Sequence, residues 1–547
     1  MRITNKIMQN NNLSNINGNK VLQDRLSTQM STQKKISRPS EDPVVAIRAL
    51  RLRSNVTEVS QYYSKNIPDA QSWLEVTEGA LKNTSAIITN MITQCTKASN
   101  GELTSGDREI ILEQLKALRD EVYATGDADY AGRYVFTGYR TDVSLSFLED
   151  ETKDYTITQQ FSRDSIDEVT FVKTTNDVNG QTVDLGEINS TNYDQIAVNE
   201  TDISSATVHR IRLGYDDCKY DENDPNTIPQ ITRVVGIDAT TGQAKAEQIL
   251  MDENDPNSVL TVTPVHSYEV PTAYELAADP ANANKAYFIP ETGEIILGEK
   301  AYSKMMGMQD DGSTATVNEG EIRITYHKEE WLKGDLRPEH YYACSAKETI
   351  DDNQVDVEYN MEYLTGTDVP KQSIEYDVGF NQTIRVNSTA DECYNPEIGR
   401  EVDDLIKALQ DVQDMEEVAS KLKGLVETET NADNRKTLQN RLDAANKALA
   451  LLKDKSQKMF ERGITKMQGY LDDTNLSLTN CGTRSSKLAL IESRLQTQKT
   501  NFETLKSENE DVDITEVAIQ LTSAELTYEA ALMATGKVMQ NTLMNFI

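Results

Sequence analysis

The stretch "SRPSEDPVVAIRALRL", residues 37–52, places two prolines at a sharp break between two helical patterns. Pro39 disfavours the helical conformation in the residue before it, and so ends the preceding helix. Ser40 is predicted to be the N-cap of the next helix, because its hydroxyl can accept a hydrogen bond from a free N–H group. Pro43 is tolerated in the first turn, where the N–H groups have no intrahelical partner. Pro39, Ser40 and Pro43 are therefore predicted to form a hinge between two helices.

Apolar residues recur after this hinge at alternating steps of three and four, which gives each helix one apolar seam, as in coiled coils and bundles. One seam consists of Leu74, Thr77, Leu81, Thr84, Ile88, Met91 and Cys95. The spacing returns after residue 400, and the last seam consists of Ile514, Val517, Leu521, Ala524, Tyr528, Ala531 and Val538. Because helices gain most of their stability by packing such a face, this last seam is predicted to be an assembly surface.

The middle of the chain has the pattern of strands, as in "EIRITYH" (321–327), where apolar and polar residues alternate. The predicted fold class is α+β: a long helical rod of the coiled-coil or bundle type, built from both chain ends, with a β-rich domain inserted in the middle. The predicted parts are an N-terminal helical region at 1–140, a β-rich insert at 141–400 and a C-terminal helical region at 401–547. Within the helical regions, terminal helices are predicted at 1–36 and 507–547, and rod helices at 43–126.

The chain has 547 residues and a formal net charge of −34 at pH 7, which argues against a nucleic-acid partner. The charge is uneven: residues 1–60 carry ten Lys or Arg against four acids, whereas residues 506–547 carry two against seven. The two ends are therefore predicted to attract each other. No stretch is apolar enough to cross a membrane, and the N-terminus lacks the apolar core of a cleaved signal peptide. Taken alone, these features predict a cytoplasmic protein.

The residue types that carry chemistry are scattered along the chain. The five cysteines are far apart and odd in number, which excludes a complete disulfide framework. "HKEEW" (327–331) lacks the second histidine of a zinc-protease motif, and "HYYAC" (340–344) has no second pair to complete a zinc site. Nucleophile-elbow, phosphate-binding and dinucleotide-binding motifs are absent from the sequence. The sequence therefore predicts no catalytic residue, no metal, no cofactor and no enzyme.

The hexapeptide "DENDPN" occurs twice, at 221–226 and 252–257. Two Asx–Pro turns between strands are the favoured interpretation. A weak calcium site is the alternative, although Pro225 and Pro256 stand where an EF-hand loop needs an oxygen ligand.

Both ends of the chain resemble a known superfamily. "MRITNKIMQNNNLSNIN" (1–17) and "WLEVTEGALKNTSAII" (73–88) resemble the flagellin-type N-terminal region, and residues 484–547 resemble the matching C-terminal region. "ISRPSEDPVVA" at the hinge, "GRYVFTGYRTD" (132–142) and the final "NTLMNFI" are similar to the flagellar hook-associated protein 3 family, the hook–filament junction proteins. The large acidic insert and the extra helical stretch at 401–455 depart from that pattern.

The resemblance implies a structural adaptor of the bacterial flagellum, which forms the junction ring between hook and filament and allows flagellin to polymerise. The implied partners are further copies of the chain, hook-associated protein 1, flagellin, an export chaperone and the type III export apparatus, but no nucleic acid and no membrane. The implied location is extracellular, after export without a cleaved signal peptide, and this replaces the cytoplasmic prediction.

Two alternatives stay open: a filament flagellin, or an exported protein whose insert is a binding or enzymatic module. The terminal segments are further expected to be disordered in the free chain, because a single helix with one apolar seam is marginal in water.

Overall fold

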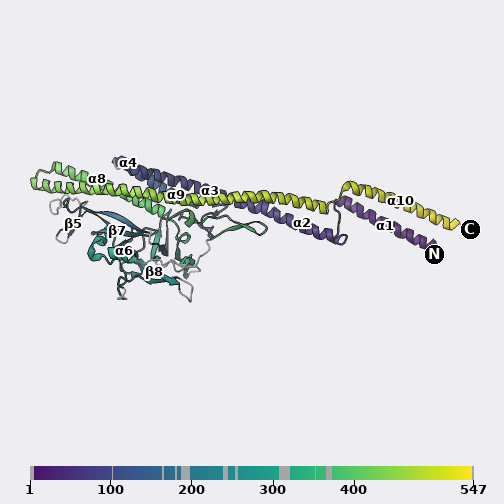
Figure 1. Ribbon diagram of the computed structural model, residues 1–547, viewed down its shortest axis with the longest axis horizontal. Helices are drawn as coiled ribbons and strands as arrows, with labels where there is room; N and C mark the ends of the chain where they lie inside the picture. The colour runs from purple at the N-terminus through teal and green to yellow at the C-terminus, as the bar shows by residue number, and fades with distance from the viewer. Residues whose placement is uncertain are drawn as a thin grey trace. The chain divides into compact units, whose positions relative to one another are not determined.

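A computed structural model describes residues 5–100, 103–162, 165–178, 181–185, 198–237, 244–252, 255, 257–306, 321–350, 353–364 and 372–544. The chain divides into two compact units. Unit 1 consists of residues 1–71, 375–384 and 484–547, and unit 2 consists of residues 72–374 and 385–483. Helices from both chain ends contribute to unit 1, and the β-rich middle of the chain belongs to unit 2 (Figure 1).

Unit 1 is built mainly from helices. Its elements are α1 (Asn5–Thr32), α2 (Pro43–Gln61), a π-helical turn (Tyr62–Asn66), the start of α3 (Ile67–Ala98), the end of α9 (Ala432–Glu510), α10 (Ile514–Met544), and the hairpin of β16 (Glu375–Gly379) and β17 (Gln382–Arg385). The helices α1 and α10 run antiparallel and pack along each other. Both ends of the chain therefore meet in one helical pair.

Pro68 explains the π-helical turn between α2 and α3. Proline has no N–H group and its ring clashes with the carbonyl four residues earlier, so the preceding turn widens. The N–H of Ile67 accordingly donates to the carbonyl of Tyr62, five residues back. The hairpin packs on this turn, where the rings of Tyr62 and Phe380 meet edge to face with centroids 5.9 Å apart.

The helices of unit 2 are the remainder of α3 and α9 together with α4 (Ser105–Ala124) and α8 (Glu397–Thr428). The helices α3 and α9 lie side by side, with Ser85 Oγ and Asn475 Oδ1 3.0 Å apart and Cys481 Sγ 3.5 Å from the carbonyl oxygen of Leu74. The seam predicted along α3 is confirmed, because all seven of its members are buried: Leu74, Thr77, Leu81, Thr84, Ile88, Met91 and Cys95.

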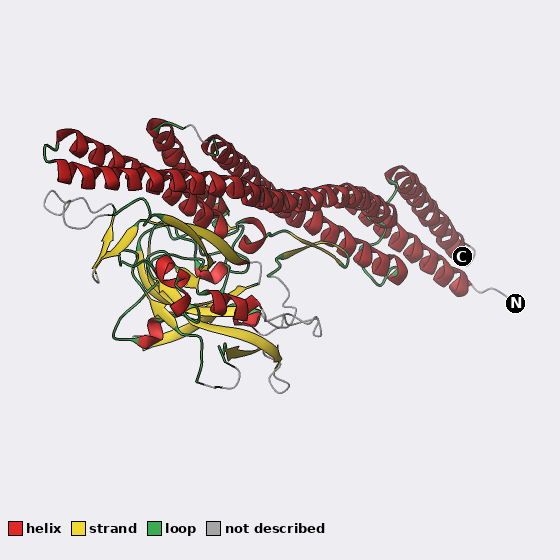
Figure 2. Cartoon of the chain, turned by 60° about the vertical axis from the view of Figure 1, so that its left-hand side comes forward, coloured by secondary structure: helices red, strands yellow, loops and turns green. Residues whose placement is uncertain are grey.

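Two sheets form the β-rich part of unit 2 (Figure 2). The five-stranded sheet has the order β10 (Val262–Pro264), β11 (Ala286–Ile289), β12 (Glu294–Leu297), β7 (Ser204–Arg212), β4 (Ile166–Lys173). The six-stranded sheet has the order β15 (Asn353–Tyr359), β14 (Ala343–Ile350), β3 (Glu151–Phe161), β13 (Ile322–Trp331), β8 (Gln230–Ile237), β9 (Ala244–Gln248). All pairs in these two sheets are antiparallel except β10 with β11.

Shorter elements complete unit 2. They are β1 (Asp129–Tyr130), β2 (Arg133–Tyr134), β5 (Thr175–Val178), β6 (Gln181–Asp184), α5 (Ala273–Ala278), α6 (Glu299–Met306) and α7 (Ala390–Cys393). The alternation read in residues 321–327 corresponds to β13, where Ile322, Ile324 and Tyr326 are buried.

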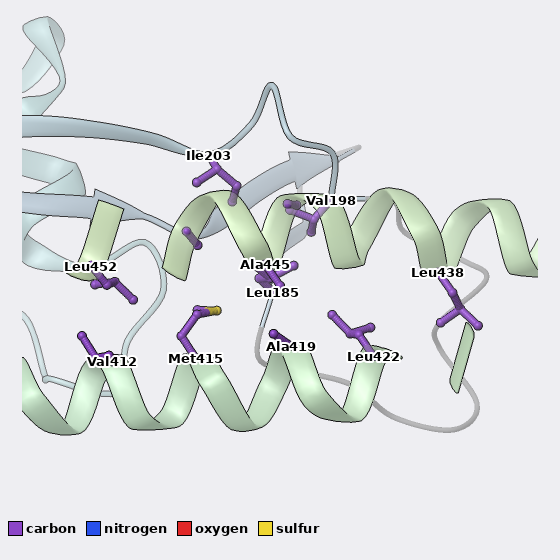
Figure 3. Close-up of a cluster of buried hydrophobic side chains, with 12 residues drawn as sticks. Leu185, Val198, Ile203, Val412, Met415, Ala419, Leu422, Leu438, Ala445 and Leu452 are labelled. Carbon is purple, nitrogen blue, oxygen red and sulfur yellow. The ribbon is translucent and has the colours of Figure 1, made fainter. Parts of the chain in front are cut away.

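The β-rich part has its own hydrophobic cluster and also shares one with the helices. Its own cluster lies around Phe171 and Ile296. The shared cluster, shown in Figure 3, brings Leu185, Val198 and Ile203 against α8 and α9. The helices contribute Val412, Met415, Ala419, Leu422, Leu438, Ala444, Ala445, Ala448 and Leu452. Strands and helices of unit 2 are therefore joined by a common core.

The α+β fold class predicted from the sequence is confirmed, with helices from both chain ends and a β-rich middle. The division into 1–140, 141–400 and 401–547 stays a prediction about independent folding. Among the helices of the described residues, none combines the length and the apolar character that crossing a membrane requires.

The terminal helices are shorter than predicted. Thr32 ends α1, and α10 begins at Ile514 rather than at residue 507. Asp513 explains the later start: its Oδ1 accepts hydrogen bonds from the N–H groups of Thr515 and Glu516, at 2.8 and 3.2 Å, and so caps the new helix.

Candidate assembly interface

The break between α1 and α2 is paired with the short connection between α9 and α10. The N–H of Lys35 donates to the carbonyl of Glu510 at 2.8 Å, and the N–H of Val512 donates to the carbonyl of Gln33 at 3.1 Å. Gln33 has a φ of 58°, a left-handed conformation that turns the chain sharply away from α1. Both connections leaving the terminal helix pair are thus tied to each other by backbone hydrogen bonds.

Asp42, and not Ser40, is the N-cap of α2. The Oδ1 of Asp42 accepts hydrogen bonds from the N–H groups of Val44 and Val45 at 2.9 and 3.1 Å, and Pro43 occupies the first turn. A carboxylate here also meets the positive end of the helix dipole. The prediction that Ser40 caps this helix is therefore wrong.

Ser40 belongs to a turn that precedes the cap. In this turn the N–H of Glu41 donates to the carbonyl of Arg38 at 3.0 Å, and Pro39 takes the position that its fixed φ favours. Because the turn uses residues 38–41, the next polar side chain caps α2. The predicted break is confirmed, whereas a hinge role for Pro39, Ser40 and Pro43 stays a prediction.

Glu510, at the end of α9, forms ion pairs with two basic side chains near this break. It is buried, at 4% exposure, and its two carboxylate oxygens accept hydrogen bonds from Arg53 Nε and Nη2 at 2.6 and 2.7 Å. Lys34 Nζ lies 3.6 Å from Glu510 Oε2 and also pairs with Asp511. The hydrogen bonds from Arg53 lower the pKa of Glu510, and the bond from Lys34 lowers the pKa of Asp511. Both acids therefore stay ionised, and they join α2 and the segment that follows α1 to the end of α9.

The seam predicted along α10 faces α1. Val517 and Ala524 form a buried cluster with Leu26 of α1, and Leu521 packs against it. The other members of the predicted seam differ in exposure: Tyr528 and Ala531 are half-buried, Ile514 is exposed, and the side chain of Val538 lies outside the described residues. Among the described residues of the pair, Leu26, Val517 and Ala524 are thus the buried members of its apolar cluster, and the polar Gln29 of α1 is buried as well.

Large apolar side chains also point away from this pair. On α10 they include Ile519, Leu526 and Met533, and on α1 Leu13 and Val21. The exposed residues of α10 lie outside the predicted seam, because that seam follows only the face of the helix that contains Val517 and Ala524. The exact sevenfold spacing of the three α10 residues is the signal that could have found them.

The helices and the five-stranded sheet of unit 2 are joined by buried charges. Asp404 of α8 accepts hydrogen bonds from Arg210 and Arg212 of β7, each with an N–O distance of 2.6 Å. Burial favours the protonated form of Asp404, but the two guanidinium groups outweigh it and hold its pKa well below the usual value. The network continues through Glu401, which lies 3.1 Å from Arg212 Nη2 and 3.0 Å from Lys466 Nζ.

The first "DENDPN" segment forms an Asx turn followed by a 3₁₀ turn. Asp221 Oδ1 accepts from the N–H of Asn223, and Asp224 Oδ1 accepts from the N–H of Asn226. Thr227, the seventh residue, closes the loop by donating from Oγ1 to the carbonyl of Asp224 at 2.7 Å. In the second segment residues 253, 254 and 256 lie outside the described residues.

Ser258 plays the same part in the second segment as Thr227 does in the first. Its Oγ donates to the carbonyls of Asp252 and Asp255 at 2.8 and 2.7 Å. The repeat is thus seven residues long and ends in a hydroxyl. Within the part of the chain that the structure describes, groups of His, Cys, Asp or Glu suited to hold a metal ion are absent.

The histidines and cysteines have structural surroundings. His340 is buried and its Nε2 lies 3.0 Å from the carbonyl oxygen of Ser144; burial lowers its pKa to about 4. All five cysteines are buried, and none forms a disulfide. Burial raises the pKa of the Cys95, Cys218 and Cys393 thiols to about 12. These thiols are therefore protonated and shielded from reagents at neutral pH.

Comparison with known proteins points to the helices at the front of the chain. Residues 3–141 match the family described as the bacterial flagellin N-terminal helical region. The chain carries a flagellin-type N-terminal region. This region contains α1 to α4, and with them the break between α1 and α2 and one helix of the terminal pair.

Individual relatives agree with this match. Flagellar hook-associated protein 3 of Salmonella typhimurium is 30% identical over 145 residues, which cover 26% of this chain and 45% of that protein. Its Escherichia coli counterpart is 30% identical over 154 residues, or 28% and 48% of the two chains. A flagellin of Clostridium tyrobutyricum is 30% identical over 122 residues, or 22% and 32%. The predicted resemblance to flagellar hook-associated protein 3 is confirmed, and the chain spans about half the length of these hook-associated relatives.

Proposed function

We propose that this chain is a structural adaptor of the bacterial flagellum, which forms the junction ring between hook and filament and allows flagellin to polymerise on it. The observation that carries the proposal is the unfinished terminal helix pair of unit 1. In the part of the pair that the structure describes, the apolar cluster has three buried members, Leu26, Val517 and Ala524, while large apolar side chains remain exposed on both helices. A surface of that kind is stabilised when neighbouring subunits cover it.

The partners follow from the same surface and from the relatives' names. Copies of this chain cover the exposed faces in the ring, with hook-associated protein 1 on the hook side and flagellin on the filament side. Before assembly, an export chaperone shields the apolar faces, and the type III apparatus exports the chain without a cleaved signal peptide. Five buried cysteines without a disulfide support export as an unfolded chain, because a disulfide would hinder it.

Complementation of a deletion strain tests this function. The strain without the chain is expected to make hooks without filaments and to shed flagellin into the medium, as seen by electron microscopy and immunoblotting. The full chain restores filaments, whereas a chain truncated after Asp513 is expected to fail. A deletion strain with normal filaments would contradict the proposal.

A filament flagellin is the second candidate, because a flagellin is among the similar proteins. The two candidates differ in location. Immunogold labelling against the β-rich part of unit 2 is expected to mark one position between hook and filament. Labelling along the whole filament would favour the flagellin alternative.

A further inference from the structure

Helix α2 presents an apolar stripe to solvent beside two cations. The α2 stripe consists of Val44, Ile47 and Leu50, which are 55–65% exposed. At 100° per residue these side chains lie within one third of the helix circumference. Arg48 and Arg51 share this face and are exposed. Neither arginine forms an ion pair with a described residue.

Helix α10 presents a second apolar stripe beside two anions. The α10 stripe consists of Ile519, Leu526 and Met533, which are 63–66% exposed and lie opposite the seam that faces α1. Glu525 and Glu529 both lie on one side of this stripe, with Glu529 the nearer of the two. Like the arginines of α2, they are exposed and form no ion pair with the residues that the structure describes.

The charge complementarity of the two chain ends is thus only partly used inside the chain. Lys34 and Arg53 pair with Glu510 and Asp511 at the break. The arginines of α2 and the glutamates of α10 are left over, each pair beside an apolar stripe. The spacings also match, because charges three apart on α2 can face charges four apart on α10, one helical turn in each case.

We infer that the α2 stripe of one copy docks on the α10 stripe of a neighbouring copy. Arg48 and Arg51 then meet Glu525 and Glu529 while the apolar side chains bury one another. Two different surfaces meet, so the contact is head-to-tail and can close a ring. This inference rests on the proposed function and adds to it which helices of neighbouring subunits meet.

The size of the stripes fits a contact that forms only within an assembly. The α2 stripe is about 9 Å long and the α10 stripe about 21 Å, at a rise of 1.5 Å per residue. Such a patch is well below the roughly 800 Å² per partner of a stable two-chain complex. The free chain is therefore expected to stay monomeric, and each subunit of a closed ring makes the contact twice.

Cross-linking between two single-cysteine variants tests the contact. Ile47→Cys and a differently tagged Leu526→Cys are produced together in the deletion strain, and isolated flagella are treated with a short bismaleimide. The native cysteines are buried, so only the introduced thiols react. A product that carries both tags is expected. Thr497→Cys, on an exposed position of α9, replaces Leu526→Cys in the control and is expected to give no such product.

Charge reversal adds a second readout. Arg48→Glu with Arg51→Glu in the Ile47→Cys copy is expected to lower the cross-linked fraction about five- to tenfold, since two exposed ion pairs become repulsive. Glu525→Arg with Glu529→Arg in the Leu526→Cys copy is expected to restore it. Restoration requires the two faces to meet, which a general folding defect would not reproduce.

Three results would overturn the inference: no product carrying both tags in flagella that contain the chain, a product between two Leu526→Cys copies, or a product with a different protein. Any of them would leave the junction function intact. Flagella that lack the wild-type chain altogether would instead contradict the proposed function.

Discussion

The terminal pair of α1 and α10 and the hairpin of α8 and α9 are both antiparallel helix pairs with regular apolar seams, yet their cores differ. The apolar cluster of the terminal pair has three buried members among the described residues. The hairpin belongs to a cluster of twelve, because Leu185, Val198 and Ile203 of the β-rich part form a third layer (Figure 3). The same periodicity thus gives a large core where the β-rich part adds a third layer of side chains, and a small core where the chain adds none.

Removal of the Asp404 carboxylate is expected to have the largest effect on stability, since this group joins α8 to the five-stranded sheet. Asp404→Asn replaces the carboxylate that Arg210 and Arg212 share by a neutral amide, so two buried cations lose its negative charge, which should cost about 3–5 kcal/mol of unfolding free energy. Urea unfolding followed by circular dichroism measures the loss. Asp414→Asn, an exposed change on the same helix, is the control and should stay within about 0.5 kcal/mol. Equal effects would mean that the network does not hold unit 2 together.

Removal of one buried leucine from each core tests whether the terminal pair and unit 2 unfold separately. Leu422→Ala is expected to lower the unfolding free energy of unit 2 by about 2–5 kcal/mol, because a buried leucine leaves a cavity. Leu26→Ala is expected to leave that transition unchanged and to open the terminal pair. Trypsin should then cut at Lys20 and Arg25 in α1, as measured by intact mass. A Leu26→Ala variant that shifts the main unfolding transition would show that the two cores are one.

The buried faces of the helices could be predicted from the sequence, because they depend only on the spacing of nearby apolar residues. Steps of three and four predicted a seam from Leu74 to Cys95 and another that includes Val517 and Ala524, and these residues are buried in the structure. The expectation that the terminal segments are disordered differs from the structure, in which both are helices. That expectation considered each terminal helix by itself. The ion pairs of Glu510 and Asp511 join residues more than 450 positions apart, and they could not be read from one helix.

Interactions that depend on distant or competing groups could not be predicted. Arg210 and Asp404 are 194 residues apart, and nothing in either local sequence marks the partner. At the hinge, Ser40 and Asp42 are both good N-caps, and only the turn at residues 38–41 decides between them. The outer stripe of α10 was accessible to sequence analysis, since its three residues are spaced by seven.

Loss of the N-cap of α2, in unit 1, is expected to lower stability by a smaller amount. Asp42→Ala is expected to cost about 1 kcal/mol at the start of α2, because the N–H groups of Val44 and Val45 lose their acceptor. Ser40→Ala is the matched control and should change the helix by only a few tenths of a kcal/mol. Hydrogen exchange of a peptide covering residues 43–50 measures both. A larger effect from Ser40→Ala would reinstate that residue as the cap.

The smallest expected effect is the acid sensitivity of the terminal pair. Arg53 lowers the pKa of Glu510 below its ordinary value of about 4.5, so the native state binds this proton less readily than the unfolded chain does. The stabilisation is fully present above that value and is lost as the pH falls through the lower native pKa. Asp511 acts in the same direction, whereas the raised pKa values of Lys34 and Arg53 matter only in strong alkali. Within the range from acid to neutral pH, it is therefore acid that weakens the ion pairs at the break between α1 and α2.

A cysteine in the seam reports this opening. Ala524→Cys places a thiol in the buried cluster with Leu26, where 4,4′-dithiodipyridine, which reacts with thiols in acid, reaches it only when α1 and α10 separate. The rate is expected to rise as the pH falls from 5 to 3. In the added presence of Glu510→Gln, the rate at pH 7 should be higher and the rise in acid smaller, because one of the two titrating acids is gone. An unchanged pH profile would mean that the ion pairs of Glu510 at the break do not stabilise the packing of α1 on α10.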